Sequence, residues 1–223
     1  MRIVIQCAAK KDPSAGSLRS SNQREVLFVA QPDLAPSEAV QHYARPDDVS
    51  DDGRTWRERL VAYNAVANNP LHLLPAYRLY ARDAYGALAD RFGPGRLYIL
   101  SAGWGLIAAN FLTPRYDITF TTSADDWKRR RKGDRYQDFC MLSDDNDPIV
   151  FVGGKDYLPL FSNLTARLHA PKIVFYNSGE APNLAEGFEA IRYPTTTRTN
   201  WHYECARDLA DGNLDLPLRQ ARK

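Results

Sequence analysis

The sequence predicts an α/β fold, in which a mostly parallel central sheet is flanked by helices and carries polar loop insertions. Four short runs are continuously apolar, as strands are when a parallel sheet buries both of their faces. Helical patterns lie between several of these runs, which is the order of a parallel α/β unit. The four runs are Arg2–Cys7, Leu97–Ser101, Ile149–Val152 and Lys172–Tyr176.

A chain of 223 residues can bury a sizeable core, so we expect a single domain over residues 1–223. Segment 14–53 is polar and interrupted by prolines, and it is expected to be an insertion. Within it, only Val26–Val29 has the composition of a strand. Residues 212–223 are expected to form a C-terminal tail.

The first two helices are expected between the first and second apolar runs. One covers about Arg54–Ala67, where Trp56, Leu60 and Tyr63 share a face. The other is expected to begin near Pro75 and to continue unbroken through Leu88, because its apolar and aromatic side chains form one stripe. The glycines and proline at 93–95 would end it.

Two further helices are expected in the C-terminal half. The first covers Lys155–Leu168 and has Pro159 in its first turn, where proline is tolerated. The second covers Trp201–Ala210, with Cys205 and Leu209 on the same face, and Gly212 ends it.

Composition restricts the class of protein. The formal net charge is only +2, so a nucleic-acid-binding surface would have to be local. The three cysteines are isolated, which argues against a disulfide framework and a structural zinc site and favours a reducing cytoplasm. No apolar run approaches the roughly 20 residues that span a bilayer, so we expect no membrane association. No histidine, cysteine or carboxylate spacing suggests a metal site.

The ends of the four strands are the expected site. In open α/β sheets, ligands bind outside the carboxyl ends of the strands. Small or polar residues stand at all four ends, and glycines there permit close approach to a ligand. The candidate ligand-binding residues at these ends are Gln6, Cys7, Ser101, Gly103, Trp104, Gly153, Gly154 and Asn177.

Several familiar site motifs are missing. The glycine-rich turns match neither the dinucleotide fingerprint nor the P-loop, which argues against classical NAD and ATP binding. The nucleophile elbow of serine hydrolases is also absent. We therefore expect no cofactor.

Two further segments could contact nucleic acid. Lys128–Lys132 is a run of five consecutive cations behind Trp127, a pattern that fits phosphate contacts but also a solvated face. Thr197, Arg198 and Asn200 precede the last helix, where they could contact phosphate or simply cap the helix.

The central part of the chain resembles the YaaA family of peroxide-stress proteins and its smaller relatives. The motif Leu100-Ser101-Ala102, with Gly105-Leu106 shortly after it, is followed by Pro114 and by Tyr116-Asp117 in an order similar to that of the family. The strand and lysine turn of Met1–Asp12 and the helical segment Tyr77–Leu88 are also similar. The resemblance implies an α/β protein associated with DNA, and it is weaker after Val150.

We therefore expect an enzyme that acts on DNA, namely an N-glycosylase that flips out and excises a damaged or modified base, with phage defence as one biological setting. Such chemistry needs a carboxylate near the developing oxocarbenium charge, and an aromatic-walled pocket for the extruded base. Asp117 is the expected carboxylate, and His202 could protonate or hydrogen-bond the leaving base. Tyr116, beside Asp117, and Asn200 are also expected to bind the substrate. Lys10 or Lys11 could instead form a Schiff base with the sugar.

The backbone of the DNA would be held by cations and hydroxyls. The residues expected to do so are Lys10, Lys11, Arg129, Arg130, Arg131, Thr197 and Arg198. Two alternatives remain open at this point: a non-catalytic DNA-binding stress protein of the YaaA type, and an enzyme that processes a small nucleoside or nucleotide.

Overall fold

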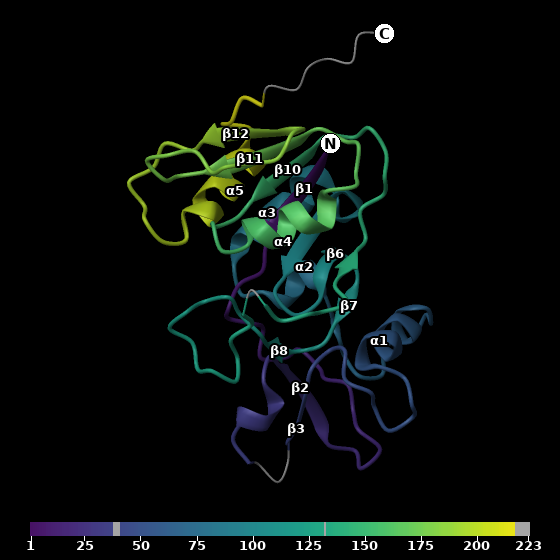
Figure 1. The fold of residues 1–223 in the computed structure, drawn as a ribbon. Coiled ribbons are helices and arrows are strands. Elements are labelled where there is room, and N and C mark those ends of the chain that lie inside the picture. The colour runs from purple at the N-terminus through teal and green to yellow at the C-terminus, as the bar shows by residue number, and fades with distance from the viewer. Residues whose placement is uncertain (38–40, 132, 217–223) are drawn as a thin grey trace.

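The central sheet of the computed structural model confirms the predicted α/β fold (Figure 1). The structure describes residues 1–37, 41–131 and 133–216. The strands are ordered β12-β11-β10-β1-β5-β6-β9, and β12 through β5 are mutually parallel. Strand β6 is antiparallel to β5 and parallel to β9. These strands are β1 Arg2–Gln6, β5 Leu97–Ser101, β6 Gly105–Ala108, β9 Phe139–Cys140, β10 Ile149–Val152, β11 Lys172–Tyr176 and β12 Phe188–Arg192.

The register places the four predicted strands side by side. Ile3 of β1 lies opposite Leu97 of β5 and Val150 of β10, and Ile173 of β11 continues the row. The side chains of these four residues are almost completely buried. The continuous apolar pattern of these strands follows from their place in the middle of the sheet, covered on both faces.

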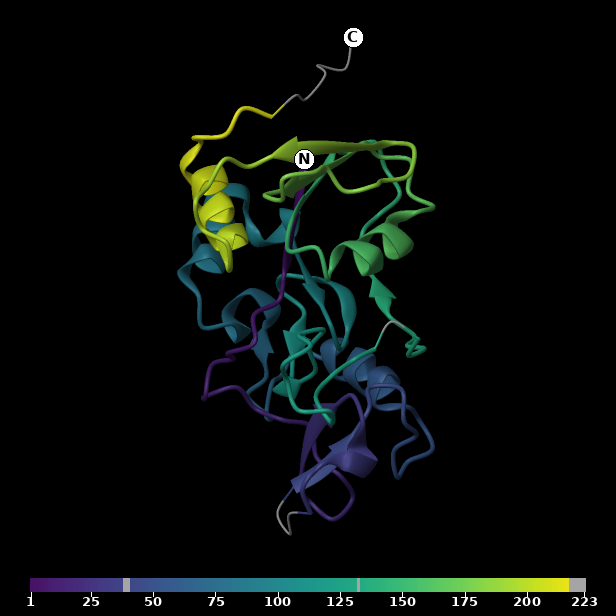
Figure 2. The same cartoon turned by 60° about the vertical axis from the view of Figure 1, so that its left-hand side comes forward.

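Helices cover both faces of the central sheet (Figure 2). Helices α3 (Asp83–Phe92) and α5 (Trp201–Asp211) lie on one face, and α4 (Leu158–Thr165) lies on the other. As predicted, α4 has its proline in the first turn, and α5 ends at Gly212, which adopts a left-handed conformation.

The predicted helix from Pro75 to Leu88 is two helices. Helix α2 (Ala76–Leu79) ends before Tyr80, and α3 begins at Asp83. Between them the backbone pairs with the lysine turn instead of continuing the helix. Asp12 N–H donates to the Leu79 carbonyl, Ala81 N–H donates to the Lys10 carbonyl, and Lys11 forms a β-bridge with Tyr80. The sequence has the apolar stripe of a single helix, but pairing with the lysine turn interrupts that helix.

The proline-rich insertion forms part of a second, smaller sheet. Its order is β3-β2-β8, all parallel, with β2 Glu25–Val29, β3 Gln41–Ala44 and β8 Tyr116–Asp117. Strand β2 was predicted and β3 was not. In Figure 1 this sheet lies beyond the carboxyl end of β1. Residues 38–40 of the insertion, and 217–223 of the predicted tail, lie outside the described residues.

The remaining elements connect the two sheets. Helix α1 (Trp56–Asn64) confirms the first predicted helix and begins with a capping box between Thr55 and Glu58. Strands β4 (Leu74–Pro75) and β7 (Leu112–Thr113) form a two-stranded pair. Short 3-10 helices cover Pro32–Leu34 and Pro94–Arg96. No helix in the described part of the chain is both long and apolar enough to span a membrane.

Candidate functional site

A cavity of about 590 Å³ lies at the carboxyl ends of β1, β10 and β11 and extends to the start of α5. We call it the inner pocket. It lies where ligands bind in open α/β sheets. It brings together many of the residues predicted from the sequence, namely Gln6, Gly153, Gly154, Asn177, Arg198, Asn200 and His202.

Gln6 is held in a single orientation at the base of the inner pocket. The backbone N–H of Gly154 donates to Gln6 Oε1 at 2.5 Å, and the Tyr85 hydroxyl donates to the Gln6 carbonyl at 2.7 Å. A backbone N–H can only donate, so Oε1 is the acceptor and Nε2 the donor of the side-chain amide. A Cβ on Gly154 would come within 3.3 Å of Gln6 Oε1, so the glycine permits this approach.

His202 faces Gln6 across the inner pocket. The distance between Gln6 Nε2 and His202 Nε2 is 3.0 Å. Because the Gln6 amide donates from Nε2, the imidazole accepts at Nε2 and carries its proton on Nδ1. Burial and, to a smaller extent, the nearby charge of Arg82 together lower the pKa of His202 to about 4. The imidazole is therefore neutral near pH 7, which favours hydrogen bonding to the base over protonation of it, the two roles that the sequence left open for His202.

The side of the inner pocket near the start of α5 is lined by Asn177, Arg198 and Asn200. Asn177 Nδ2 donates to the Thr197 carbonyl at 3.2 Å, which ties the end of β11 to this segment. Asn200 adopts a left-handed conformation, with a φ of 63°, and its side chain does not cap α5. Arg198 is exposed and lines the pocket, so its side chain is available at the pocket mouth, whereas Thr197 is exposed but lies outside the lining.

Ser101, Gly103 and Trp104 lie in the core and do not line the inner pocket. Ser101 Oγ accepts from the backbone N–H groups of Gly103 and Trp104 and donates to the Tyr116 hydroxyl at 2.9 Å. Trp104 is fully buried and packs edge-on against Phe28, with ring centroids 4.9 Å apart. These residues form the turn after β5. They were predicted to contact substrate, but their burial away from the inner pocket gives them a structural position instead.

Two buried arginines hold that turn in place. Arg130 donates to the Ala102 carbonyl at 2.8 Å and forms a bidentate ion pair with Asp138. Arg57 donates to the carbonyls of Gly103 and Trp104 and forms an ion pair with Asp47. Arg130 was predicted to contact DNA phosphate, but its guanidinium is committed to these internal partners.

The other described cations of the basic run are also paired internally. Lys128 lies 3.2 Å from Asp117 and 3.0 Å from Asp125, and Arg129 lies 2.7 Å from Asp126. Arg131 reaches Asp126 only at 3.9 Å and is the most exposed of the described cations in the run. Lys132 lies outside the described residues. Of the described cations in this run, Arg131 is therefore the one whose side chain remains largely available to a phosphate.

Asp117 lies beside the lysine turn, outside the lining of the inner pocket. Its side chain is 37% exposed and is paired with Lys128. The ammonium of Lys11 lies 4.2 Å from the centre of the Tyr116 ring, and burial lowers the Lys11 pKa while nearby Cys7 and Asp117 oppose that shift. Lys10 is exposed. Lys11 therefore has the better environment for a neutral, nucleophilic amine.

Cys7 connects this region to the inner pocket. Its sulfur lies 3.2 Å from the hydroxyl of Tyr157, which lines the pocket. Tyr116 and Tyr80 share a hydroxyl contact of 2.9 Å nearby. Cys7 and Tyr116 are buried, so both support the pocket wall and neither is open to a ligand.

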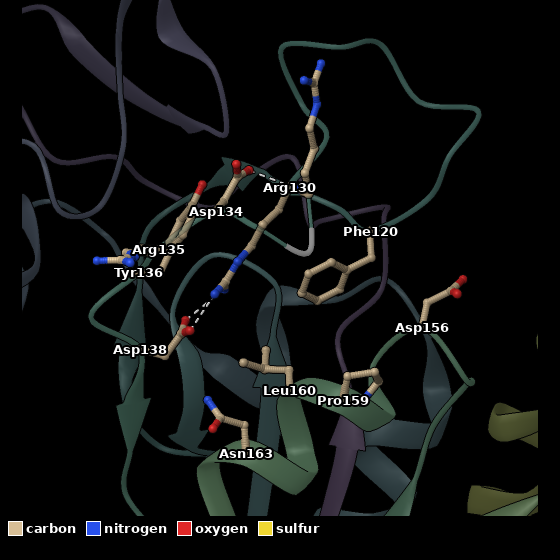
Figure 3. A pocket seen from close by; sticks show the side chains of 11 residues that line it. Phe120, Arg130, Asp134, Arg135, Tyr136, Asp138, Asp156, Pro159, Leu160 and Asn163 are labelled. Atoms are coloured by element: carbon tan, nitrogen blue, oxygen red, sulfur yellow. Dashed lines mark hydrogen bonds and ion pairs between the residues drawn. The ribbon is translucent and has the colours of Figure 1, made fainter. Parts of the chain in front are cut away.

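A second cavity of about 570 Å³ adjoins the first, and we call it the outer pocket (Figure 3). Figure 3 shows Arg130 directed at Asp138, with the Phe120 ring beside it and Leu160, Pro159 and Asn163 below. Phe120 and Asp156 line both pockets.

Sequence reasoning missed Phe120, Asp156 and Tyr157 as site residues. Asp156 and Tyr157 come two and three residues after Gly154, so the strand-end argument used for the glycines could have been extended to them. Phe120 and Tyr157 meet edge to face, with centroids 5.1 Å apart, and no local pattern in the sequence predicts that contact.

No family model matches the chain, and no curated protein or solved structure is significantly similar to it. The resemblance to the YaaA family thus remains a prediction. Among the described residues, no group of three or more histidine, cysteine or carboxylate side chains could hold a metal ion.

Proposed function

We propose that the protein is an enzyme that cleaves the N-glycosidic bond of a damaged or modified nucleotide in DNA, with the base bound in the inner pocket. One observation carries the proposal. The inner pocket combines fixed neutral hydrogen-bonding groups, Gln6 and His202, with aromatic walls from Phe120 and Tyr157 and a carboxylate from Asp156. An extruded base needs such walls and such edge contacts.

The proposed chemistry replaces the base with water at C1′ of the sugar. The electron pair of the C1′–N bond leaves with the base, which takes up a proton, and water adds to C1′ and loses one. A carboxylate near C1′ stabilises the oxocarbenium character of the transition state. His202, neutral near pH 7, would hydrogen-bond the base.

Two carboxylates compete for the catalytic role. Asp117 is the candidate from the sequence, but it is paired with Lys128 and lies outside the lining of the pocket. Asp156 lines the pocket and makes no ion pair among the described residues. We therefore assign the role to Asp156 and keep Asp117 as the alternative.

The matched variants Asp156→Asn and Asp117→Asn test this assignment. Removing a transition-state charge partner lowers the rate by about two to three orders of magnitude. We expect that loss for Asp156→Asn and a loss of less than about tenfold for Asp117→Asn. The measurement is the release of abasic sites from canonical, damaged and phage-modified DNA. The reverse order of losses would return the role to Asp117.

A second candidate, an enzyme that acts on a free nucleoside or nucleotide, is favoured by a specific observation. The described cations 128–130 are paired with carboxylates of the same chain, which leaves little of this basic run for contact with a duplex. Cleavage of mononucleotides at the rate found for DNA would support this candidate. Affinity for DNA without any product would instead support the non-catalytic DNA-binding alternative.

A further inference from the structure

The inner and outer pockets meet at a shared wall. Phe120 and Asp156 line both cavities, and the first turn of α4 separates them, with Tyr157 and Leu158 on the inner side and Pro159 and Leu160 on the outer side. The cavities have similar volumes, about 590 and 570 Å³. A ligand that extends from one pocket to the other must pass the ring of Phe120.

The outer pocket has a flat, rigid wall. The Arg130 guanidinium lies 3.9 Å from the centre of the Tyr136 ring and 5.5 Å from that of Phe120. Its bidentate pair with Asp138 holds it there, and both side chains are at most 7% exposed. Arg130 thereby holds the half-buried rings of Tyr136 and Phe120 in place, and such aromatic planes are surfaces on which nucleobases stack.

The charges that line the outer pocket balance one another, which suits a neutral planar group such as a base. Asp138 neutralises Arg130, and the exposed cations Arg131 and Arg135 offset the carboxylates of Asp134 and Asp156. Pro159 and Leu160 provide an apolar floor (Figure 3). Asn163 is exposed, and its side-chain amide makes no hydrogen bond to any described residue, so it is available to the polar edge of a base.

We infer that the outer pocket binds the base of the nucleotide next to the one held in the inner pocket, on the same strand. This inference rests on the proposed function and specifies its substrate. Two neighbouring bases on opposite sides of Phe120 cannot stack on each other. The substrate is therefore a single-stranded or locally unstacked segment of at least two nucleotides.

The length of the ligand tests the inference. Kd values are measured for thymidine monophosphate, the thymidine dinucleotide, oligothymidylate and its duplex with oligoadenylate. Base–aromatic stacking predicts that the dinucleotide binds about tenfold more tightly than the mononucleotide. We also expect oligothymidylate to bind more tightly than the duplex. Equal affinities for mononucleotide and dinucleotide would overturn the inference.

A matched pair of variants tests whether the second base binds in the outer pocket. Asn163→Ala removes the free amide from the outer pocket, and we expect it to raise the Kd of the dinucleotide about fivefold without changing that of the mononucleotide. Asn146→Ala is the control, because Asn146 is exposed and lines neither pocket. Phe120→Ala should weaken both ligands, since Phe120 lines both pockets. An equal effect of Asn163→Ala on both ligands would place the second base elsewhere.

Failure of this inference is distinguishable from failure of the proposed function. Length-dependent binding without cleavage of any DNA would contradict the glycosylase and leave the two-base site in place. Cleavage of DNA without length-dependent binding would leave the enzyme in place and remove the second base.

Discussion

Gln6 and His202 illustrate how one backbone group sets the chemistry of a site. The N–H of Gly154 fixes the Gln6 amide, and the amide then fixes the tautomer of His202. His202 is only 5% exposed, so its charged form would be poorly solvated. The position of His202 at the start of a helix was predictable from the sequence. Its protonation state was not, because it depends on burial by segments that are distant in sequence.

The lowered pKa of His202 predicts a pH-dependent stability. Between about pH 4 and the ordinary value of 6.5, the unfolded chain binds a proton at His202 that the folded protein does not. Stability therefore falls as the pH decreases through this window, by about 3 kcal/mol from this residue alone. Urea unfolding at pH 7.5 and pH 5 should show about 2 kcal/mol of this loss, because pH 5 lies partway through the window.

The variant His202→Gln should lack much of that pH dependence. His169→Gln is the control, since His169 is exposed on the surface and pairs with Asp144. If the wild type and His202→Gln lose stability equally between the two pH values, His202 is protonated in the folded state and the role assigned to it in the pocket is incorrect.

The turn between β5 and β6 shows how a sequence motif can be structural in origin. Gly105 has a φ of +83°, and a Cβ there would lie 2.5 Å from the Phe139 carbonyl oxygen, so only glycine fits. The adjoining carbonyls are satisfied by Arg57 and Arg130, which come from two different segments. The tryptophan between two glycines at the end of β5 suggested a ligand site from the sequence. In the structure, packing and the geometry of the turn account for this arrangement of residues.

Arg130→Met is expected to destabilise the fold strongly. It would leave Asp138, whose side chain is 7% exposed, without its partner, and removal of one member of a buried ion pair costs about 3–5 kcal/mol. The double variant Arg130→Met/Asp138→Leu should recover part of this loss. Urea unfolding of both variants, with Arg131→Ala as the exposed control, measures the difference. A cost below about 1 kcal/mol for Arg130→Met would show that the pair is not needed to hold the turn.

At the scale of the whole molecule, the elements that could be predicted are those with a recognisable apolar pattern in their own residues. The four central strands and the helices α1, α4 and α5 have patterns that their own residues determine. Strands β3 and β12 were missed because they are partly exposed edge strands, with mixed composition. The division of the site into two pockets depends on the contact of Phe120 with Tyr157, which only tertiary packing creates.

The small net charge of +2 makes the salt dependence of the proposed DNA binding a sensitive measurement. Each phosphate contact on a single strand contributes about 0.7 to the log–log salt slope. Arg131 is exposed and lines the outer pocket, so Arg131→Ala should reduce the slope by about that amount. Arg129→Ala, the matched control, should leave it unchanged, because Arg129 is engaged by Asp126 and the Thr122 carbonyl. Identical slopes for all three proteins would mean that Arg131 contacts no phosphate.

The position of β1 has a consequence for how the chain folds during synthesis. Ile3 pairs with Leu97 on one side and with Val150 on the other, so β1 leaves the ribosome well before either of its partner strands has been made. Pairing between residues so far apart in sequence is slow, and unpaired apolar strands are prone to aggregation in the meantime. The nascent chain should therefore depend on chaperones until β10 has emerged, and slower translation between β5 and β10 should lower the yield of native protein.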